Sequence, residues 1–165
     1  MQFKRILTHL LYSRRKLHKA FPPSSLAAIK TLIHAAESGH SGEIRFAVEA
    51  ALEWPALWRG QSARERALEV FSQLHVWDTE HNNGVLVYLL LADRDVEIVA
   101  DRGIHLKTGT QGWETICKEM EVYFRKGEFE TGLRIGIANI ADQLCQHFPA
   151  SSDERNELPD QPTVL

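Results

Sequence analysis

The side chains best suited to chemistry lie at the ends of two adjacent strands that the sequence predicts. An apolar run over 84–91 is typical of one strand, and the alternating residues 94–101 indicate the next. Because so few residues join them, the strands must form an antiparallel hairpin, which places Asn83 near Asp101 and Asp93 at the opposite end. At ~3.3 Å per residue the two ends lie roughly 25 Å apart, so Asp93 and Asp101 cannot share one ion.

The first candidate site is the open end of this hairpin. The metal-ligand candidates there are Glu80, Asn82, Asn83, Asp101 and His105, joined by Glu43 if a first strand begins at the same end. Carboxylate and amide oxygens suit Ca²⁺ or Mg²⁺, which are hard cations, and no nucleotide or organic cofactor is indicated. Ordinary turn chemistry is the alternative, with the asparagines supplying turn hydrogen bonds and Asp101 capping a strand end.

The second candidate site is the opposite end, where two parallel strands would finish. Its members are Glu49, Glu53, Asp93, Arg94 and Asp95. Open α/β sheets bind ligands outside the carboxyl ends of their parallel strands. A charged, solvated hairpin tip is the alternative. At neither end does a motif place a Ser or Cys beside a His, so no nucleophile is predicted.

The fold class follows from the elements that must position these residues. Residues 43–49 alternate with period two, 63–74 have one apolar helical face, and the apolar run then forms a second strand. Such a βαβ unit has parallel strands and a right-handed connection. The apolar run predicts a central strand covered on both faces. We therefore expect an α/β fold with a three- to four-stranded mixed sheet, a parallel βαβ unit plus an antiparallel hairpin, and helices on both faces.

Further helices are predicted over 26–36, 113–124 and 129–144 from apolar residues at helical spacing. Trp54, Trp58 and Trp77 flank the crossover helix, and we expect them to cover the sheet. If two of them were exposed together, they would instead indicate an interaction surface.

Composition narrows the class of protein. A chain of 165 residues with 44% hydrophobic residues fits one domain, and its net charge of −3 gives no basic face of the kind that binds nucleic acid. No convincing secretion signal is present, and no run approaches the ~20 apolar residues that span a bilayer. We therefore expect a cytoplasmic protein.

The two ends of the chain differ from its centre. Residues 1–20 form a basic helix or extension, with no acidic residue before Glu37. A helix docked on the domain is favoured over peripheral membrane contact through residues 1–19, because the apolar residues are few and no Trp marks an interface. Residues 150–165 are polar, lack periodicity and are predicted to be disordered.

The motifs of residues 21–149 resemble the TPM domain family, named for thylakoid-lumen and photosystem II repair proteins and a nematode receptor modulator. Asn82-Asn83-Gly84-Val85-Leu86-Val87 is similar to the family's pair before NGVLLL, Asp93-Arg94 to its Asp-Arg turn, and Val96-Glu97-Ile98 to the following strand. Residues 124–133 look like its helix-turn-helix sequence. Asp101-Arg102-Gly103-Ile104-His105 departs from the family's glycine-rich turn, because its aromatic and acidic residues are replaced.

The resemblance implies an α/β sandwich over residues 21–149. It further implies a module that binds a divalent metal ion or a protein partner in support of membrane-associated complexes. The alternative that it implies is a metal-dependent phosphatase, a phosphate-ester hydrolase.

Overall fold

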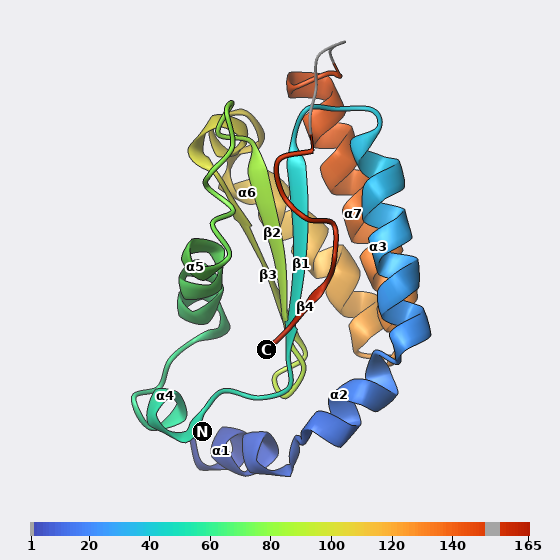
Figure 1. Cartoon of the computed structure of the whole chain (residues 1–165). Helices are drawn as coiled ribbons and strands as arrows, with labels where there is room; N and C mark the ends of the chain where they lie inside the picture. The colour runs from blue at the N-terminus through green and yellow to red at the C-terminus, as the bar shows by residue number, and fades with distance from the viewer. Residues whose placement is uncertain (1, 151–155) are drawn as a thin grey trace.

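The computed structural model describes residues 2–150 and 156–165, and its centre is a four-stranded mixed sheet. The spatial order is β3-β2-β1-β4, made of β1 (Glu43–Glu49), β2 (Gly84–Leu90), β3 (Asp95–Ala100) and β4 (Thr163–Val164). β1 runs parallel to β2 and β4, whereas β2 and β3 are antiparallel. The predicted βαβ unit and hairpin are therefore confirmed, with β2 in the interior of the sheet (Figure 1).

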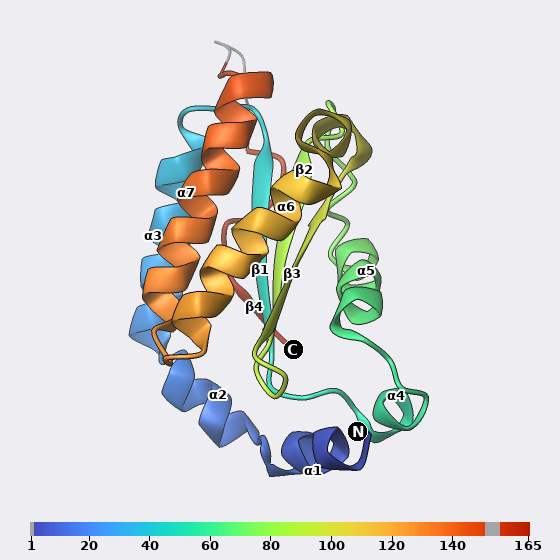
Figure 2. The ribbon, with the colours of Figure 1, turned by 180° about the vertical axis from the view of Figure 1, so that it is seen from behind.

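Helices cover both faces of the sheet, as predicted. One face carries α3 (Pro23–Glu37), α6 (Arg102–Phe124) and α7 (Phe129–His147), and the other carries α5 (Ala63–Gln73) (Figures 1 and 2). The remaining helices, α1 (Gln2–Leu11), α2 (Arg14–Ala20) and α4 (Trp54–Trp58), lie beyond the end of β1. None of the helices formed by the described residues is long and apolar enough to cross a bilayer.

The side chains of β2 divide the core in two, because alternate residues of a strand point to opposite faces. Val85, Val87 and Leu89 join the larger apolar cluster under α3, α6 and α7. Leu86, Tyr88 and Leu90 join the smaller cluster under α5. Every residue of β2 is buried, which confirms the prediction of a doubly covered central strand.

Local signals explain where two helices begin. α5 starts with a capping box, in which Ser62 and Glu65 satisfy each other's backbone N–H groups. α6 begins at Arg102, earlier than the helix predicted from residue 113, because Asp101 serves as its N-cap. Gly109 has a non-helical backbone and kinks α6 between its first turns and the remainder. The predicted helix is therefore the longer part of α6.

The C-terminal residues differ from the predicted disordered tail. Residues 156–165 lie along the outer edge of β1, whereas 151–155 fall outside the described residues. Both carboxylate oxygens of Glu43 accept backbone N–H groups, from Glu157 at 2.8 Å and Leu158 at 3.3 Å. Arg45 donates to the Pro159 carbonyl oxygen. These bonds hold the segment so that β4 can pair with β1.

Candidate functional site

The open end of the hairpin brings Asn83 and Asp101 to the same edge of the sheet. The Asp101 N–H donates to the Gly84 carbonyl oxygen at 2.8 Å, so Asp101 lies across from the residue that follows Asn83. Asp101 also caps α6, and its Oδ1 accepts the Arg102 N–H at 2.7 Å. Gly103 allows the next turn of α6 to approach the carbonyl oxygens of His81 and Asn82 closely.

The two side chains nevertheless leave the sheet on opposite faces, because Asn83 alternates with Gly84 and Asp101 is the register neighbour of Gly84. Asn83 is fully buried, and its amide nitrogen donates to the Ser41 carbonyl oxygen at 3.0 Å. One oxygen of each side chain, Asn83 Oδ1 and Asp101 Oδ2, is buried without a hydrogen-bond partner within the described ranges. Among the candidate metal ligands at this end of the hairpin, these two oxygens are the ones that are buried and unpaired within the described residues.

The other members of the first candidate site lie apart from these oxygens. Glu80 is exposed, and its backbone N–H donates to the carboxylate of Glu157. Asn82 adopts a positive φ of 54° in the turn, and its carbonyl oxygen accepts the Ile104 N–H. His105 instead lines a groove along β3 that also contains Asp95 and Glu97. Across residues 2–150 and 156–165, no group of three or more His, Cys, Asp or Glu side chains converges as a metal site would require.

The second candidate site is divided among separate contacts. Glu49 points to the α5 face, where it accepts the Tyr88 hydroxyl at 2.6 Å and Arg66 Nε at 2.9 Å. Glu53 is exposed at the N-cap of α4. Arg94 has a positive φ of 54° and donates to the Arg125 carbonyl oxygen at 3.3 Å. These three residues therefore do not form one cluster.

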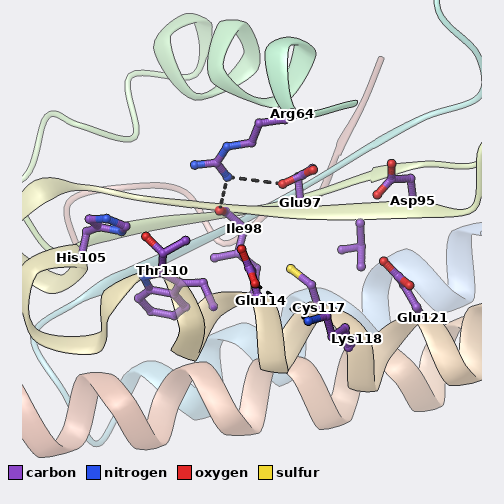
Figure 3. Close-up of a pocket in the computed structure, with 12 residues that line it drawn as sticks. Arg64, Asp95, Glu97, Ile98, His105, Thr110, Glu114, Cys117, Lys118 and Glu121 are labelled. Carbon is purple, nitrogen blue, oxygen red and sulfur yellow. Dashed lines mark hydrogen bonds and ion pairs between the residues drawn. The ribbon is translucent and has the colours of Figure 1, made fainter. Parts of the chain in front are cut away.

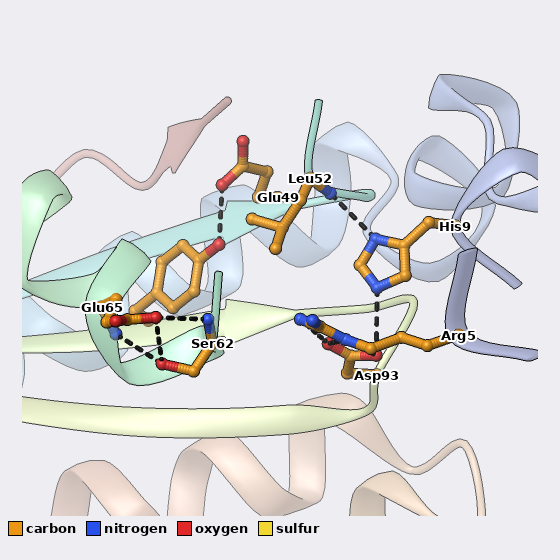
Figure 4. Close-up of polar contacts among 8 residues, drawn as sticks. Arg5, His9, Glu49, Leu52, Ser62, Glu65 and Asp93 are labelled. Atoms are coloured by element: carbon orange, nitrogen blue, oxygen red, sulfur yellow. Dashed lines mark hydrogen bonds and ion pairs between the residues drawn. The ribbon is translucent and has the colours of Figure 1, made fainter. Parts of the chain in front are cut away.

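The carboxylate of Asp93 is bound by two side chains of the N-terminal helix α1 (Figure 4). Arg5 donates to it from Nε and from Nη2, the latter at 2.8 Å, and His9 Nε2 lies 3.0 Å from Oδ1. His9 Nδ1 accepts the Leu52 N–H at 3.0 Å, so the ring proton lies on Nε2 and points at Asp93. Burial alone would raise the pKa of Asp93, but these hydrogen bonds outweigh it and lower that pKa. Asp93 thus fastens α1 to the hairpin.

Asp95, the last member of the second set, lines an acidic groove of about 490 Å³ along the outer edge of β3. Asp95 and Glu97 point to the α5 side of that edge, whereas Glu114 and Glu121 rise from α6 on the other side (Figure 3). Two cations also line the groove: Arg64 of α5 reaches over it, and Lys118 of α6 lies 3.8 Å from Glu114 (Figure 3). We call this surface the β3 groove.

The carboxylates of the β3 groove repel one another. Burial, followed by the charges of Glu97, Glu121 and Asp93, raises the pKa of Asp95 to about 6. Burial also raises the pKa of Glu97 against the lowering effect of Arg64. The thiol of Cys117 also lines the groove, and it stays protonated because burial raises its pKa to about 12. The groove therefore favours a positively charged occupant over a nucleophilic reaction.

Comparison with known proteins places the fold in a family. A family model described as the TPM domain matches residues 16–143. The chain belongs to the TPM domain family. The solved NMR structure of BA42 from the psychrophilic bacterium Bizionia argentinensis is similar to it, with a TM-score of 0.76 and 31% sequence identity over 86% of this chain and 93% of that one. No curated protein matches this chain.

Sequence reasoning missed the β3 groove of this TPM domain, although it contained part of the signal. Glu114, Cys117 and Glu121 recur at helical spacing beside the apolar face of α6, and Asp95 alternates with Val96 before Glu97. The missing information was that α6 begins at Arg102 and returns along β3. Only that path brings the two sets of carboxylates to opposite sides of one strand edge.

Proposed function

We propose that this TPM domain is a binding module that receives a basic, extended segment of a partner protein in the β3 groove. The observation that carries the proposal is that the acidic side chains line an unpaired strand edge of the sheet. Extended peptides commonly bind by adding a strand to such an edge, with backbone hydrogen bonds giving affinity and side-chain contacts giving specificity.

The backbone of β3 supports this mode of binding. Asp101 donates to Gly84, so in the antiparallel register the alternating residues Val96, Ile98 and Ala100 direct their N–H and C=O groups away from β2. A strand added at this edge would hydrogen-bond to Val96 and Ala100 directly, and to Ile98 after displacing the contacts of Ile98 with Arg64 and with the Cys117 thiol. Its alternate side chains would then meet Asp95 and Glu97 on one face, and the carboxylates of α6 on the other.

Arg64 indicates how a basic group would be received. Its Nη1 donates to the Ile98 carbonyl oxygen at 2.6 Å and lies 3.4 Å from Glu97 Oε2. The guanidinium thus occupies one outward backbone acceptor and one carboxylate of the groove. Since Arg64 is half exposed, an incoming strand could displace it at little cost.

A short lysine-rich peptide with blocked ends is expected to bind the β3 groove, and its binding should shift the amide NMR signals of Val96, Ile98 and Ala100. The double variant Asp95→Asn with Glu97→Gln should weaken binding about tenfold, because two partly exposed ion pairs contribute about 1 kcal/mol or less each. Affinity should also fall as pH drops through about 6, since Asp95 then takes up a proton. Arg64→Ala should strengthen binding, because it removes the internal competitor.

The matched control is Asp142→Asn, which removes an exposed carboxylate from α7, outside this groove. It should leave peptide affinity unchanged, and a peptide with glutamate in place of lysine should not bind. Equal weakening by Asp142→Asn, or shifts confined to residues outside 95–121, would contradict the proposal.

A divalent cation at Asp101 is the second function that we propose. Its support is one buried carboxylate oxygen, Asp101 Oδ2, that has no hydrogen-bond partner within the described residues. Carboxylate and backbone carbonyl oxygens are ligands that Ca²⁺ prefers, and Gly103, two residues after Asp101, packs against the carbonyl oxygens of residues 81–82. Asp101 would be the principal ligand, because Asn83 leaves the other face of the sheet.

Titration with Ca²⁺ or Mg²⁺ is expected to give saturable amide shifts at Gly84 and at residues 101–105. Asp101→Asn should weaken binding by at least about tenfold, since even loss of a group that only supports a metal ligand costs about that much. Asp78→Asn, which removes an exposed carboxylate in the preceding loop, is the control. Shifts that survive Asp101→Asn would exclude this position.

The phosphatase alternative depends on the same cation. A metal ion at Asp101 would polarise a phosphate ester and activate water. If Asp101→Ala abolishes the metal-dependent hydrolysis of a generic phosphate ester, the alternative gains support. Hydrolysis that persists in Asp101→Ala would remove this residue from any such activity.

A further inference from the structure

Helix α1 docks on the domain by its polar side and turns its apolar side to solvent. The buried His9 and the ion-paired Arg5 face the hairpin, as described above. Phe3, Leu7 and Leu10 follow one another at helical spacing on the opposite side and are exposed, Phe3 by 84%. An amphipathic helix that served only to cover the domain would have the reverse orientation.

A second group of exposed apolar residues lies beside α1. Trp54 and Trp58 of α4 are both exposed, Trp58 by 71%, and their ring centroids are 5.8 Å apart. The hydrogen bond from the Leu52 N–H to His9 ties the segment before α4 to α1, and Figures 1 and 2 place the two helices next to each other. The expectation that these tryptophans cover the sheet is therefore wrong. We call the combined surface the apolar base: Phe3, Leu7, Leu10, Leu11, Trp54 and Trp58.

The charges around the apolar base are almost all positive. Exposed basic side chains lie on α1, on α2 and directly after α4, and the sequence has no acidic residue before Glu37. They are Lys4, Arg14, Arg15, Lys16, Lys19 and Arg59. The exposed Glu53 at the start of α4 is the one acidic residue within 50–59. Asp93 is neutralised by Arg5.

From these observations we infer that the apolar base docks on an anionic lipid bilayer, with α1 lying in the plane of the membrane surface. Leucine and phenylalanine would enter the acyl boundary, and the paired tryptophans would sit at the headgroup level, where such rings are enriched. The lysine and arginine side chains would contact anionic headgroups. The basic side chains around the apolar base favour a lipid surface over a second copy of this chain, because the basic side chains of two copies would repel each other. The inference rests on other residues than those of the β3 groove, which runs along the edge of β3.

Vesicles of phosphatidylglycerol and phosphatidylcholine are expected to sediment the full chain and to shift its tryptophan fluorescence to shorter wavelength. Vesicles of phosphatidylcholine alone should retain it at least about tenfold less, because the basic side chains meet no anionic headgroups there. The double variant Leu7→Ser with Leu10→Ser should lose about tenfold or more of the retention. Both side chains are exposed, so the variant should fold, as its circular dichroism would verify.

The control is Leu106→Ser, which changes an equally apolar side chain, 81% exposed near the start of α6, the helix that follows β3. It should bind vesicles as the unchanged chain does. Equal retention of the Leu7/Leu10 variant, or equal retention on phosphatidylcholine alone, would overturn the inference. So would light scattering that shows a dimer which the Leu7/Leu10 variant dissociates, since a second copy would then cover the apolar base.

Discussion

Replacing Glu37 by glutamine is expected to stabilise the protein at pH 8 by about 2 kcal/mol and to flatten its stability between pH 5 and pH 8. Burial, reinforced by the charges of Glu43 and Asp160, raises the pKa of Glu37 from 4.5 to about 8 against the lowering effect of the Ile44 N–H. Below pH 4.5, the pKa of Glu37 in the unfolded chain, both the folded and the unfolded protein hold the proton. Between pH 4.5 and about 8 only the folded protein holds it, so the stability falls as pH rises, and the loss is complete above about pH 8.

The magnitude is smaller than the full shift would give, because Glu37 is partly exposed and solvent screens the interaction. Glutamine keeps an oxygen to accept the Ile44 N–H, which Glu37 binds at 2.8 Å. The charged groups around it are Glu43, Arg45 and Asp160, and His34 pairs with Asp160. Because these groups also titrate, the quantity to compare is the difference between the variant and the unchanged chain.

Urea unfolding at several pH values measures this difference. Glu128→Gln, which removes an exposed carboxylate at the start of α7, is the matched control and should leave the pH dependence unchanged. If Glu37→Gln followed the same pH curve as the unchanged chain, the buried proton on Glu37 would be refuted.

Substitution of Gly84 by alanine is expected to destabilise the fold by about 3 kcal/mol, the upper part of the usual range for overpacking. A Cβ at this position would collide with the carbonyl oxygen of Val76, and backbone cannot move aside as a flexible side chain can. The loop of residues 75–82 would have to shift, and with it the turn that meets Asp101. The glycine of the Asn82-Asn83-Gly84 motif is therefore explained by close packing of this loop.

Denaturant midpoints compare this variant with Gly112→Ala, a glycine-to-alanine change within α6. There the new Cβ meets only the methyl group of Thr108 at 2.6 Å, a side-chain atom that can rotate away. Alanine also favours the helix by up to about 1 kcal/mol. Equal stability of Gly84→Ala and the unchanged chain would show that the Val76 loop yields without cost.

The parts of the fold that were predictable from sequence are those set by local periodicity. The unbroken apolar run of β2 could only suit a strand covered on both faces, and the short turn at Asp93 forced an antiparallel partner. β4 gave no such signal, because two residues carry no period. Its position depends on Glu43 and Arg45, which bind the tail from more than a hundred residues away in sequence.

The candidate sites show the same limit. The predicted strand ends placed Asn83 and Asp101 at the same end of the sheet correctly. Their side chains do not converge, because they leave the sheet on opposite faces. At the other end, Asp93 could not be assigned without knowing that Arg5 and His9 return to it. The strand end at which a residue lies predicts which residues are near it. A binding site also requires that their side chains point toward the same place.

The short pairing of β4 with β1 has a consequence for assembly. Leu165 donates to Val48 at 3.0 Å, and the chain's own last residues thus occupy the edge of the sheet opposite β3. A two-residue edge strand offers few unpaired backbone groups, whereas β3 offers a longer row of them. Strand addition is therefore expected at β3 rather than at β4, which disfavours stacking of the sheet through both of its edges.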